Sequence, residues 1–385
     1  GNKHDVFINF VIKPIGINNE KTHYPLSFLA GLGTMIFSYS TVVFYLHFVP
    51  THLDYSNLIC RLFRDIKLQK VEQIVLSFVV CDSRFNESLN VVKSVILFTR
   101  SPVYLVIFAD DTLRPKFNET LTEWRRLTNN QLQFELHKVS FPEKNKEEWM
   151  NLFSKCAAQR LFIPELVPHI DAMIYVDTDT LFLGPADELW QFFSQFNISQ
   201  ISAMSLEDEN PNISWYPRFA KHPFYGKYGL NSGVMLMNLT RMRTFGWVEY
   251  VTPIMLKWKL YIPWGDQDII NIVFHYHERA VLPLECRYNY RSDQCVYGDA
   301  CEAAAERGIY LLHGSRGAFH GDKQPAFQAI YRAIDEYVVG TDPSRSLLLK
   351  MEKYLTEAPF SNCGSIKETF LRVPNETLRS LYPEV

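Results

Sequence analysis

The chain has 385 residues, of which 47% are hydrophobic and 14% aromatic, and its formal net charge is -3. This length allows one large domain or two ordinary ones, and this composition excludes a chain that is disordered throughout. The slightly negative charge also argues against a protein that binds nucleic acid through a basic surface, so no nucleic-acid partner is expected.

An apolar segment lies near the start of the chain. Residues 26–49 contain no Asp, Glu, Lys or Arg. At about 1.5 Å per residue, a helix of this length can cross a bilayer core of about 30 Å. We therefore expect a short N-terminal region over 1–25, a transmembrane anchor over 26–49 and a stem over 50–70. A buried core helix and a signal-peptide core are the alternatives.

From residue 71 onward, segments typical of strands and helices alternate. Apolar runs predict buried strands over 73–81, 103–109, 131–139 and 172–176. Amphipathic spacing predicts helices over 87–98, 115–127, 149–166 and 185–196. This alternation predicts an α/β fold, with a mostly parallel sheet covered by helices on both faces in a single domain over 71–340. Residues 341–385 lack the rhythm of strands and are expected to form a helical C-terminal extension.

Two aspartates follow the fourth predicted strand directly, in the sequence Tyr-Val-Asp177-Thr178-Asp179. Because residues i and i+2 of an extended chain point the same way, Asp177 and Asp179 project together at the carboxyl end of the strand, where ligands of such sheets bind. Two adjacent carboxylates repel each other, and a divalent cation such as Mn²⁺ or Mg²⁺ relieves that repulsion. A polar turn after a strand is the alternative, since Asp and Thr are common turn residues.

Three later segments carry further candidate site residues. Asn231-Ser232-Gly233 enters a predicted strand, and the glycine lets a ligand approach the backbone closely. Asp266-Gln267-Asp268 opens a predicted helix, either as a polar cluster facing a substrate or as an acidic first turn favoured by the helix dipole. A further predicted strand ends in His313-Gly314. A neutral imidazole there is a suitable third metal ligand, and Lys323 is placed to neutralise phosphate charge.

Cysteines and glycosylation sequons favour a secretory compartment. Six Asn-x-Ser/Thr sequons occur, at Asn86, Asn118, Asn197, Asn212, Asn238 and Asn375. The chain has 7 cysteines. Cys286, Cys295 and Cys301 crowd together, and their spacing fits disulfides better than a zinc site.

Taken in order, these motifs resemble the retaining glycosyltransferases of family 8, which have the GT-A fold, and among them the glucoside xylosyltransferases of the secretory pathway. The resemblance runs from about residue 74 to about residue 339. It rests on the Asp-x-Asp motif, the Asn-Ser-Gly strand, the Gly-Asp-Gln-Asp helix start and the late His-Gly element. It also includes the segments 156–164, 215–227 and 286–301.

The resemblance implies roles for individual residues. Asp177, Asp179 and His313 would bind Mn²⁺ together with the diphosphate of UDP. The residues implied to contact the donor, in addition to these three ligands, are Val80, Cys81, Asp82, Arg160, Thr178, Asn231, Ser232, Gly233, Gly314 and Lys323. The catalytic residues beside the anomeric carbon would be Gln267, Asp268 and Asp266. The segment Val80-Cys81-Asp82, implied to lie beside the uridine, departs from the Cys-Gly-Glu of similar chains.

The implied reaction moves α-xylose from UDP-xylose to the 3-hydroxyl of O-linked glucose on EGF-like repeats, as in Notch-type receptors, with retention of configuration. Either an enzyme carboxylate acts as nucleophile or the acceptor attacks the face that UDP leaves. We favour the second, because an amide such as Gln267 is a poor nucleophile. The enzyme would be a single-pass type II protein of the endoplasmic reticulum or Golgi membrane with a lumenal catalytic domain. The alternatives are a family 8 galactosyl- or glucosyltransferase and an inactive glycan- or protein-binding domain.

Overall fold

The computed structural model describes residues 34–39, 42–47, 73–152, 156–210, 212–297 and 300–383. The chain divides into two compact units, Gly1–Lys70 and Val71–Val385. In the first unit, β1 (Thr34–Tyr39) pairs antiparallel with β2 (Val42–His47), where the sequence predicts a transmembrane helix. The rest of the predicted anchor, the region 1–25 and the stem 50–70 lie outside the described residues. No helix in the described part of the chain combines the length and apolar character needed to cross a bilayer.

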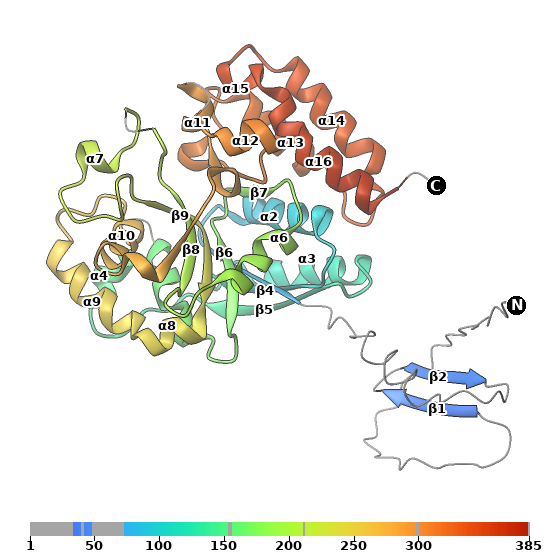
Figure 1. Ribbon diagram of the computed structural model, residues 1–385, viewed down its shortest axis with the longest axis horizontal. Helices are drawn as coiled ribbons and strands as arrows, with labels where there is room; N and C mark the ends of the chain where they lie inside the picture. Colours follow the sequence, from blue (N-terminus) through green and yellow to red (C-terminus); the bar gives the residue numbers. More distant parts are fainter. Residues whose placement is uncertain are drawn as a thin grey trace, which may run out of the picture. The chain divides into compact units, whose positions relative to one another are not determined.

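The second unit is built on a seven-stranded sheet (Figure 1). Its strands, from one edge to the other, are β10 (Val281–Leu284), β8 (Ser202–Leu206), β9 (Leu230–Asn238), β6 (Ala172–Val176), β3 (Ile74–Val80), β4 (Val103–Ala109) and β5 (Leu132–Lys138). Only β9 runs antiparallel to its neighbours, β6 and β8. The predicted strands are therefore confirmed, and so is the mostly parallel sheet.

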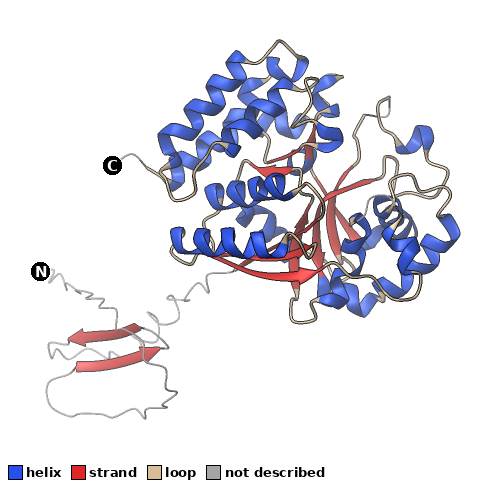
Figure 2. Cartoon of the chain, turned by 180° about the vertical axis from the view of Figure 1, so that it is seen from behind, coloured by secondary structure: helices blue, strands red, loops and turns tan. Residues whose placement is uncertain are grey.

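Helices cover both faces of this sheet (Figure 2), because successive strand residues alternate between two apolar cores. In β3, Phe78 packs in the core formed with α2 (Phe85–Phe98), α3 (Arg114–Leu127) and α6 (Ala186–Gln191). Val79 packs in the opposite core, formed with α8 (Leu239–Phe245), α9 (Trp247–Trp258) and α10 (Asp266–Tyr276). The α/β layering predicted from the sequence is thereby confirmed.

The single helix predicted over 149–166 is wrong. Within and beside this range the chain forms α4 (Lys146–Met150), the 3-10 helix η1 (Ala157–Phe162) and α5 (Ile163–Leu166). Cys156, which precedes η1, has a non-helical backbone and is bonded to Cys81 at the end of β3. This tertiary constraint, which the apolar spacing does not reveal, interrupts the helix.

A smaller sheet and the C-terminal helices complete the unit. The order of the small sheet is β11 (Tyr290–Arg291), β12 (Leu311–His313) and β7 (Thr180–Phe182). A third apolar core joins it to α13 (Pro325–Asp335), α14 (Pro343–Glu357) and α16 (Lys367–Leu381). The short helices are α7 (Tyr216–Phe219), α11 (Asp293–Val296), α12 (Glu302–Arg307), α15 (Asn362–Ser365), η2 (Phe192–Gln195), η3 (Glu278–Ala280), η4 (Cys286–Asn289) and η5 (Ser315–Gly317). The helical character predicted after residue 341 is confirmed.

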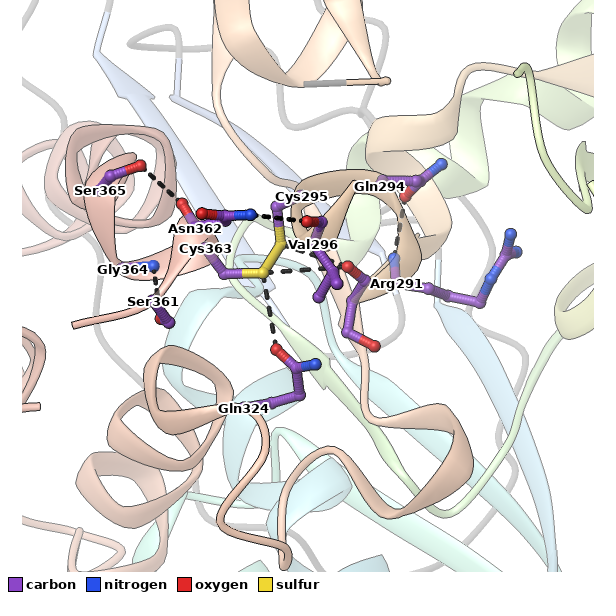
Figure 3. Close-up of a disulfide and its surroundings, with 11 residues drawn as sticks. Arg291, Gln294, Cys295, Val296, Gln324, Ser361, Asn362, Cys363, Gly364 and Ser365 are labelled. Atoms are coloured by element: carbon purple, nitrogen blue, oxygen red, sulfur yellow. Dashed lines mark hydrogen bonds between the residues drawn. A yellow bond between two sulfur atoms is a disulfide. The ribbon is translucent and has the colours of Figure 1, made fainter. Parts of the chain in front are cut away.

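Three disulfides lie in the described part of the second unit: Cys81–Cys156, Cys286–Cys301 and Cys295–Cys363. The last links α11 to α15 near the small sheet (Figure 3). The prediction of disulfides around 286–301 is confirmed, and the zinc alternative is wrong. The partner of Cys295 lies 68 residues away, beyond the reach of spacing arguments. The seventh cysteine, Cys60, lies outside the described residues.

Candidate active site

A pocket opens at the edge of the sheet where the parallel strands end. Its wall includes Asp177 after β6, Glu207 after β8, Asn231 at the start of β9, Arg291 in β11 and His313 in β12. The reversed direction of β9 brings its first residues to the edge where the neighbouring strands finish. The rule that ligands bind at this edge therefore identifies the pocket.

Asp177, Asp179 and His313 converge within this pocket. One ligand atom from each lies within 4.8 Å of the others. His313 Nε2 is 3.4 Å from Asp179 Oδ1 and 4.0 Å from Asp177 Oδ2. Antiparallel pairing of β7 with β12 places Thr180 opposite His313, which explains why residues so distant in sequence meet. Two carboxylates and an imidazole are a suitable ligand set for Mn²⁺ or Mg²⁺, so these residues fit a divalent metal.

The two aspartates differ in the direction in which their pKa values are shifted. Burial raises the pKa of Asp177, against the opposing effect of Arg160. Burial also acts to raise the pKa of Asp179, but His313 and Arg84 lower it below its ordinary value. Asp179 is therefore a carboxylate at neutral pH and available to a cation.

His313 is oriented by residues behind it. Its Nδ1 donates to Asn289 Oδ1 at 2.8 Å, which leaves Nε2 facing the two aspartates. Asn289 Nδ2 in turn donates to Asn231 Oδ1 at 2.8 Å. A side chain at position 233 would collide with the ring, because a Cβ on Gly233 would lie 2.1 Å from His313 Cε1. The structure thus gives Gly233 a close approach to the imidazole, and its predicted close approach to a ligand stays a prediction.

Arg160, from η1, links the aspartates of two different elements. Its Nη2 is 2.8 Å from Asp177 Oδ1 and its Nε is 2.6 Å from Asp266 Oδ2. Its Nη1 donates to the Ser232 carbonyl at 2.6 Å. Burial alone would lower the pKa of Arg160, but Asp177 and Asp266 raise it above its ordinary value. The guanidinium is therefore a permanent cation between β6, β9 and the start of α10.

Asp266 has an unusual environment for a carboxyl group. It is 2% exposed, and burial raises its pKa to about 7 although Arg160 acts in the opposite direction. A carboxyl group with this pKa changes its charge near neutral pH, which is common at active sites.

Gln267 is fixed between two walls of the pocket. Its Oε1 accepts from the backbone N of Ser232 at 3.0 Å, and its Nε2 donates to Glu207 Oε2 at 3.3 Å. Glu207 also accepts from Asn231 Nδ2 at 2.7 Å. These bonds leave Gln267 little freedom to rotate, so it can define one side of a sugar site.

Asp268 lies outside the pocket lining. It is fully buried and accepts from the Tyr216 hydroxyl and from the Trp264 backbone N, each at 2.8 Å. His222 Nε2 lies 3.3 Å from the same carboxylate. This arrangement makes Asp268 a residue that positions the start of α10, and a direct contact with the sugar is not supported.

Several residues predicted to contact the donor also lie away from the pocket lining. Val80 is buried in a core, and Cys81 forms a disulfide with Cys156. Asp82 is exposed in a turn with positive φ after β3. Lys323 is exposed before α13, and Thr178 and Gly314 flank the metal ligands. Their predicted contacts remain predictions.

The pocket contains residues that sequence reasoning missed. Glu207, Trp264, Arg291 and Arg316 all line it. Glu207 follows the buried strand β8 directly, so the argument that identified Asp177 could have found it. Nothing in the local sequence distinguishes Arg291 from other arginines.

Comparison with known proteins agrees with this geometry. The model for "Glycosyl transferase family 8" matches residues 75–313. Glucoside xylosyltransferase 1 of Homo sapiens is 42% identical over 328 residues, which cover 82% of this chain and 74% of that protein. Glucoside xylosyltransferase 2 of Xenopus laevis is 40% identical over 322 residues, covering 81% and 76%. The crystal structure of the galactosyltransferase LgtC with donor and acceptor sugar analogs has a TM-score of 0.54 at 17% identity, covering 69% of this chain and 97% of that one.

The protein has a GT-A-like fold, and three residues at its strand edge fit a divalent metal. The family match covers more than half of the chain, and the relatives are aligned over most of their length. The chain therefore belongs to glycosyl transferase family 8. As a member of this family it is an enzyme, with a nucleotide sugar as donor.

Proposed function

We propose that this enzyme transfers α-xylose from UDP-xylose to the 3-hydroxyl of O-linked glucose on EGF-like repeats of Notch-type receptors. The group formed by Asp177, Asp179 and His313 carries the proposal, because it lies in a chain 42% identical to a glucoside xylosyltransferase. The identity to glucoside xylosyltransferases supports UDP-xylose as the donor. The resemblance of the ordered motifs supports O-linked glucose as the acceptor.

Manganese is the metal that we assign to this group, with magnesium as the alternative. When bound, the cation supplies Lewis-acid stabilisation of the charge on the departing diphosphate. Asn289 keeps Nε2 of His313 directed toward the site. Arg160 holds Asp177 in place through its 2.8 Å ion pair.

We further propose that the acceptor attacks the face of the sugar that UDP leaves. The acceptor oxygen forms a bond to the anomeric carbon as the bond to phosphate oxygen breaks, and a phosphate oxygen takes the acceptor proton. The partners of the pocket carboxylates support this route. Asp266 is paired with Arg160, and Glu207 accepts from Asn231 and Gln267, and such partners lower the nucleophilicity of a carboxylate.

A donor screen tests the proposed reaction. The full chain with Mn²⁺ is incubated with a glucosylated EGF-like repeat and UDP-xylose, UDP-glucose or UDP-galactose in turn. We expect xylose alone to be transferred, and NMR of the product to show an α linkage. Transfer of another sugar would overturn the donor and support a family 8 galactosyl- or glucosyltransferase. Absence of both transfer and metal-dependent UDP binding would support an inactive binding domain.

We also propose a lumenal location in the endoplasmic reticulum or Golgi. Three disulfides support it, because they persist in oxidising compartments. Attachment to the membrane through residues 26–49, as a type II protein, is part of the proposal. The absence of charge in this segment supports attachment, whereas the pairing of β1 with β2 does not. Carbonate extraction of membranes and protease protection test the two parts, and release by carbonate would overturn the anchor.

A further inference from the structure

Arg291 is a buried guanidinium whose nitrogens lack hydrogen bonds. The residue is 1% exposed, and its Nε, Nη1 and Nη2 have no hydrogen-bond partner among the described residues. Glu207 Oε2 is 3.9 Å from Nη1, which is too far for a hydrogen bond. Buried donors without partners are destabilising and rare, so a group of three calls for an explanation.

The local structure directs this guanidinium into the pocket. Arg291 is in register with His313 across the parallel pair β11 and β12. Register partners lie on the same face of a sheet, and both residues line the pocket. The backbone of Arg291 is fixed by a 2.9 Å hydrogen bond from its N to Gln294 Oε1. Figure 3 shows the side chain extending away from the Cys295–Cys363 disulfide.

Negative charge is already present around Arg291. Glu207 lies between two cations, with Arg316 Nη2 3.9 Å from its other oxygen. Arg316 also pairs with Asp293, its Nη1 being 2.9 Å from Oδ2. The two acidic residues that follow Glu207 also interact electrostatically with Arg291, so the two guanidinium groups already have several carboxylates around them. What Arg291 lacks is hydrogen-bond acceptors, not negative charge, and a neutral ligand rich in oxygen would supply them.

We propose that Arg291 is a sugar-recognition residue whose N–H groups donate to hydroxyl oxygens of a neutral sugar in the pocket. This inference rests on the proposed glycosyl transfer. Glu207 assists, because it approaches Arg291 and holds Asn231 and Gln267 through hydrogen bonds of 2.7 and 3.3 Å. The shared chemistry is a ring with neighbouring hydroxyl groups, which either the transferred sugar or the acceptor sugar provides.

Kinetics of Arg291→Met distinguish these two sources. We expect kcat/KM for transfer to fall about 10- to 100-fold, the range for losing hydrogen bonds to a charged group. Hydrolysis of the UDP-sugar without acceptor is measured alongside. If Arg291 contacts the transferred sugar, hydrolysis falls as much as transfer does. If it contacts the acceptor, only transfer falls.

Deoxygenated substrates test the contact itself. Removing the hydroxyl that Arg291 binds should lower wild-type kcat/KM by a factor similar to that of the mutation. The same deoxy-sugar should cause little further loss in Arg291→Met. If every deoxy-sugar lowers kcat/KM by the same factor in both enzymes, Arg291 binds no sugar hydroxyl and the proposal is overturned.

Arg287 offers a matched control nearby. It is 6% exposed and outside the pocket lining, and its nitrogens are satisfied: Nε donates to the Gly308 carbonyl at 3.0 Å and Nη2 to the Arg307 carbonyl at 3.1 Å. We expect Arg287→Met to lower the unfolding temperature with little change in kcat/KM below that temperature. Arg291→Met should unfold at or above the wild-type temperature while losing activity.

The outcomes are separable from those of the donor screen. If that screen returns a different donor sugar, the same variants are measured with that sugar. If Arg291→Met keeps full activity in both transfer and hydrolysis, the inference is overturned while the proposed function stays intact. A loss of stability in Arg291→Met as large as that in Arg287→Met would assign Arg291 a structural role and also overturn it.

Discussion

Arg160 and Arg291 line the same pocket and are both nearly buried, but their partners differ. Arg160 is 6% exposed and has two carboxylates and a carbonyl within 2.8 Å. Arg291 is 1% exposed, and its guanidinium has no hydrogen bond within the described residues. Arg160 holds carboxylates of the protein itself, whereas the N–H groups of Arg291 remain available to a ligand. Burial alone therefore does not reveal the function of a charged residue, whereas its partners do.

The comparison is tested most directly by Arg160→Met. We expect the free energy of unfolding to fall by about 3–5 kcal/mol, because removal of Arg160 leaves its two carboxylate partners, one of them buried, without compensation. Asp177 and Asp266 are the carboxylates concerned. Denaturant unfolding of Arg160→Met beside Arg291→Met measures the difference. Equal stability of the two variants would contradict the distinction between these arginines.

Asp179→Asn tests the metal side of the pocket without removing a partner of Arg160. We expect kcat to fall about 100- to 1,000-fold with the fold intact, because an amide is a weaker metal ligand than a carboxylate. Activity over a range of Mn²⁺ concentrations is the measurement. Glu123→Gln, which removes an exposed ion pair with Arg126 on α3, is the control and should change nothing. Unchanged turnover of Asp179→Asn at saturating Mn²⁺ would refute the metal role.

Asn289→Leu tests whether metal affinity depends on the residue behind the histidine. We expect Mn²⁺ affinity to fall about 10- to 100-fold, the range for losing a residue that orients a ligand. His313 Nδ1 then lacks the acceptor that holds Nε2 toward the aspartates. Calorimetric titration with Mn²⁺ measures the effect. Asn289→Asp keeps an acceptor for His313 and should lose less Mn²⁺ affinity. An equal loss in the two variants would argue against a role of position 289 in orienting the His313 ring.

The smallest expected effect concerns the pH dependence of stability through Asp266. Its pKa rises from 3.8 to about 7 on folding, so the folded protein binds this proton more tightly than the unfolded chain. The stabilisation is fully present below about pH 4 and is lost as pH rises through about 7. In metal-free protein, the unfolding temperature of wild type relative to Asp266→Asn should drop by roughly 2–4 °C between pH 5 and pH 8. A constant difference would show that Asp266 does not titrate in this window.

Local patterns in the sequence predicted much of the fold. Buried strands such as β3 and β4 are continuous apolar runs, and such runs depend little on distant residues. The failure over 149–166 has a long-range cause, since Cys156 is bonded to Cys81, 75 residues earlier. The antiparallel direction of β9 was equally invisible, because strand direction is a property of the sheet.

The candidate site likewise contains residues that local sequence predicts and residues that only the tertiary structure reveals. Asp177 and Asp179 were predictable because they follow a strand at a spacing that places both on one side. His313 was a candidate ligand because it ends a predicted strand, but only the ordered set of motifs joined it to the two aspartates. These groups are oriented by Asn289, behind the histidine, and by Arg160, between two carboxylates. Neither partner could be predicted, because the spacing of residues in the sequence does not encode the directions of their side chains.

The sequence by itself determined the alternation of strands and helices, the strand-end location of the aspartates and the glycosyltransferase family, because each rests on local periodicity or ordered motifs. Only the tertiary structure decided which buried polar residues are satisfied. Asp268 is bonded to Tyr216 and Trp264 away from the pocket, whereas Arg291 faces it without hydrogen bonds among the described residues. The physical reason is that a hydrogen bond joins atoms brought together from distant segments, and it tolerates errors of only a few tenths of an ångström in their separation.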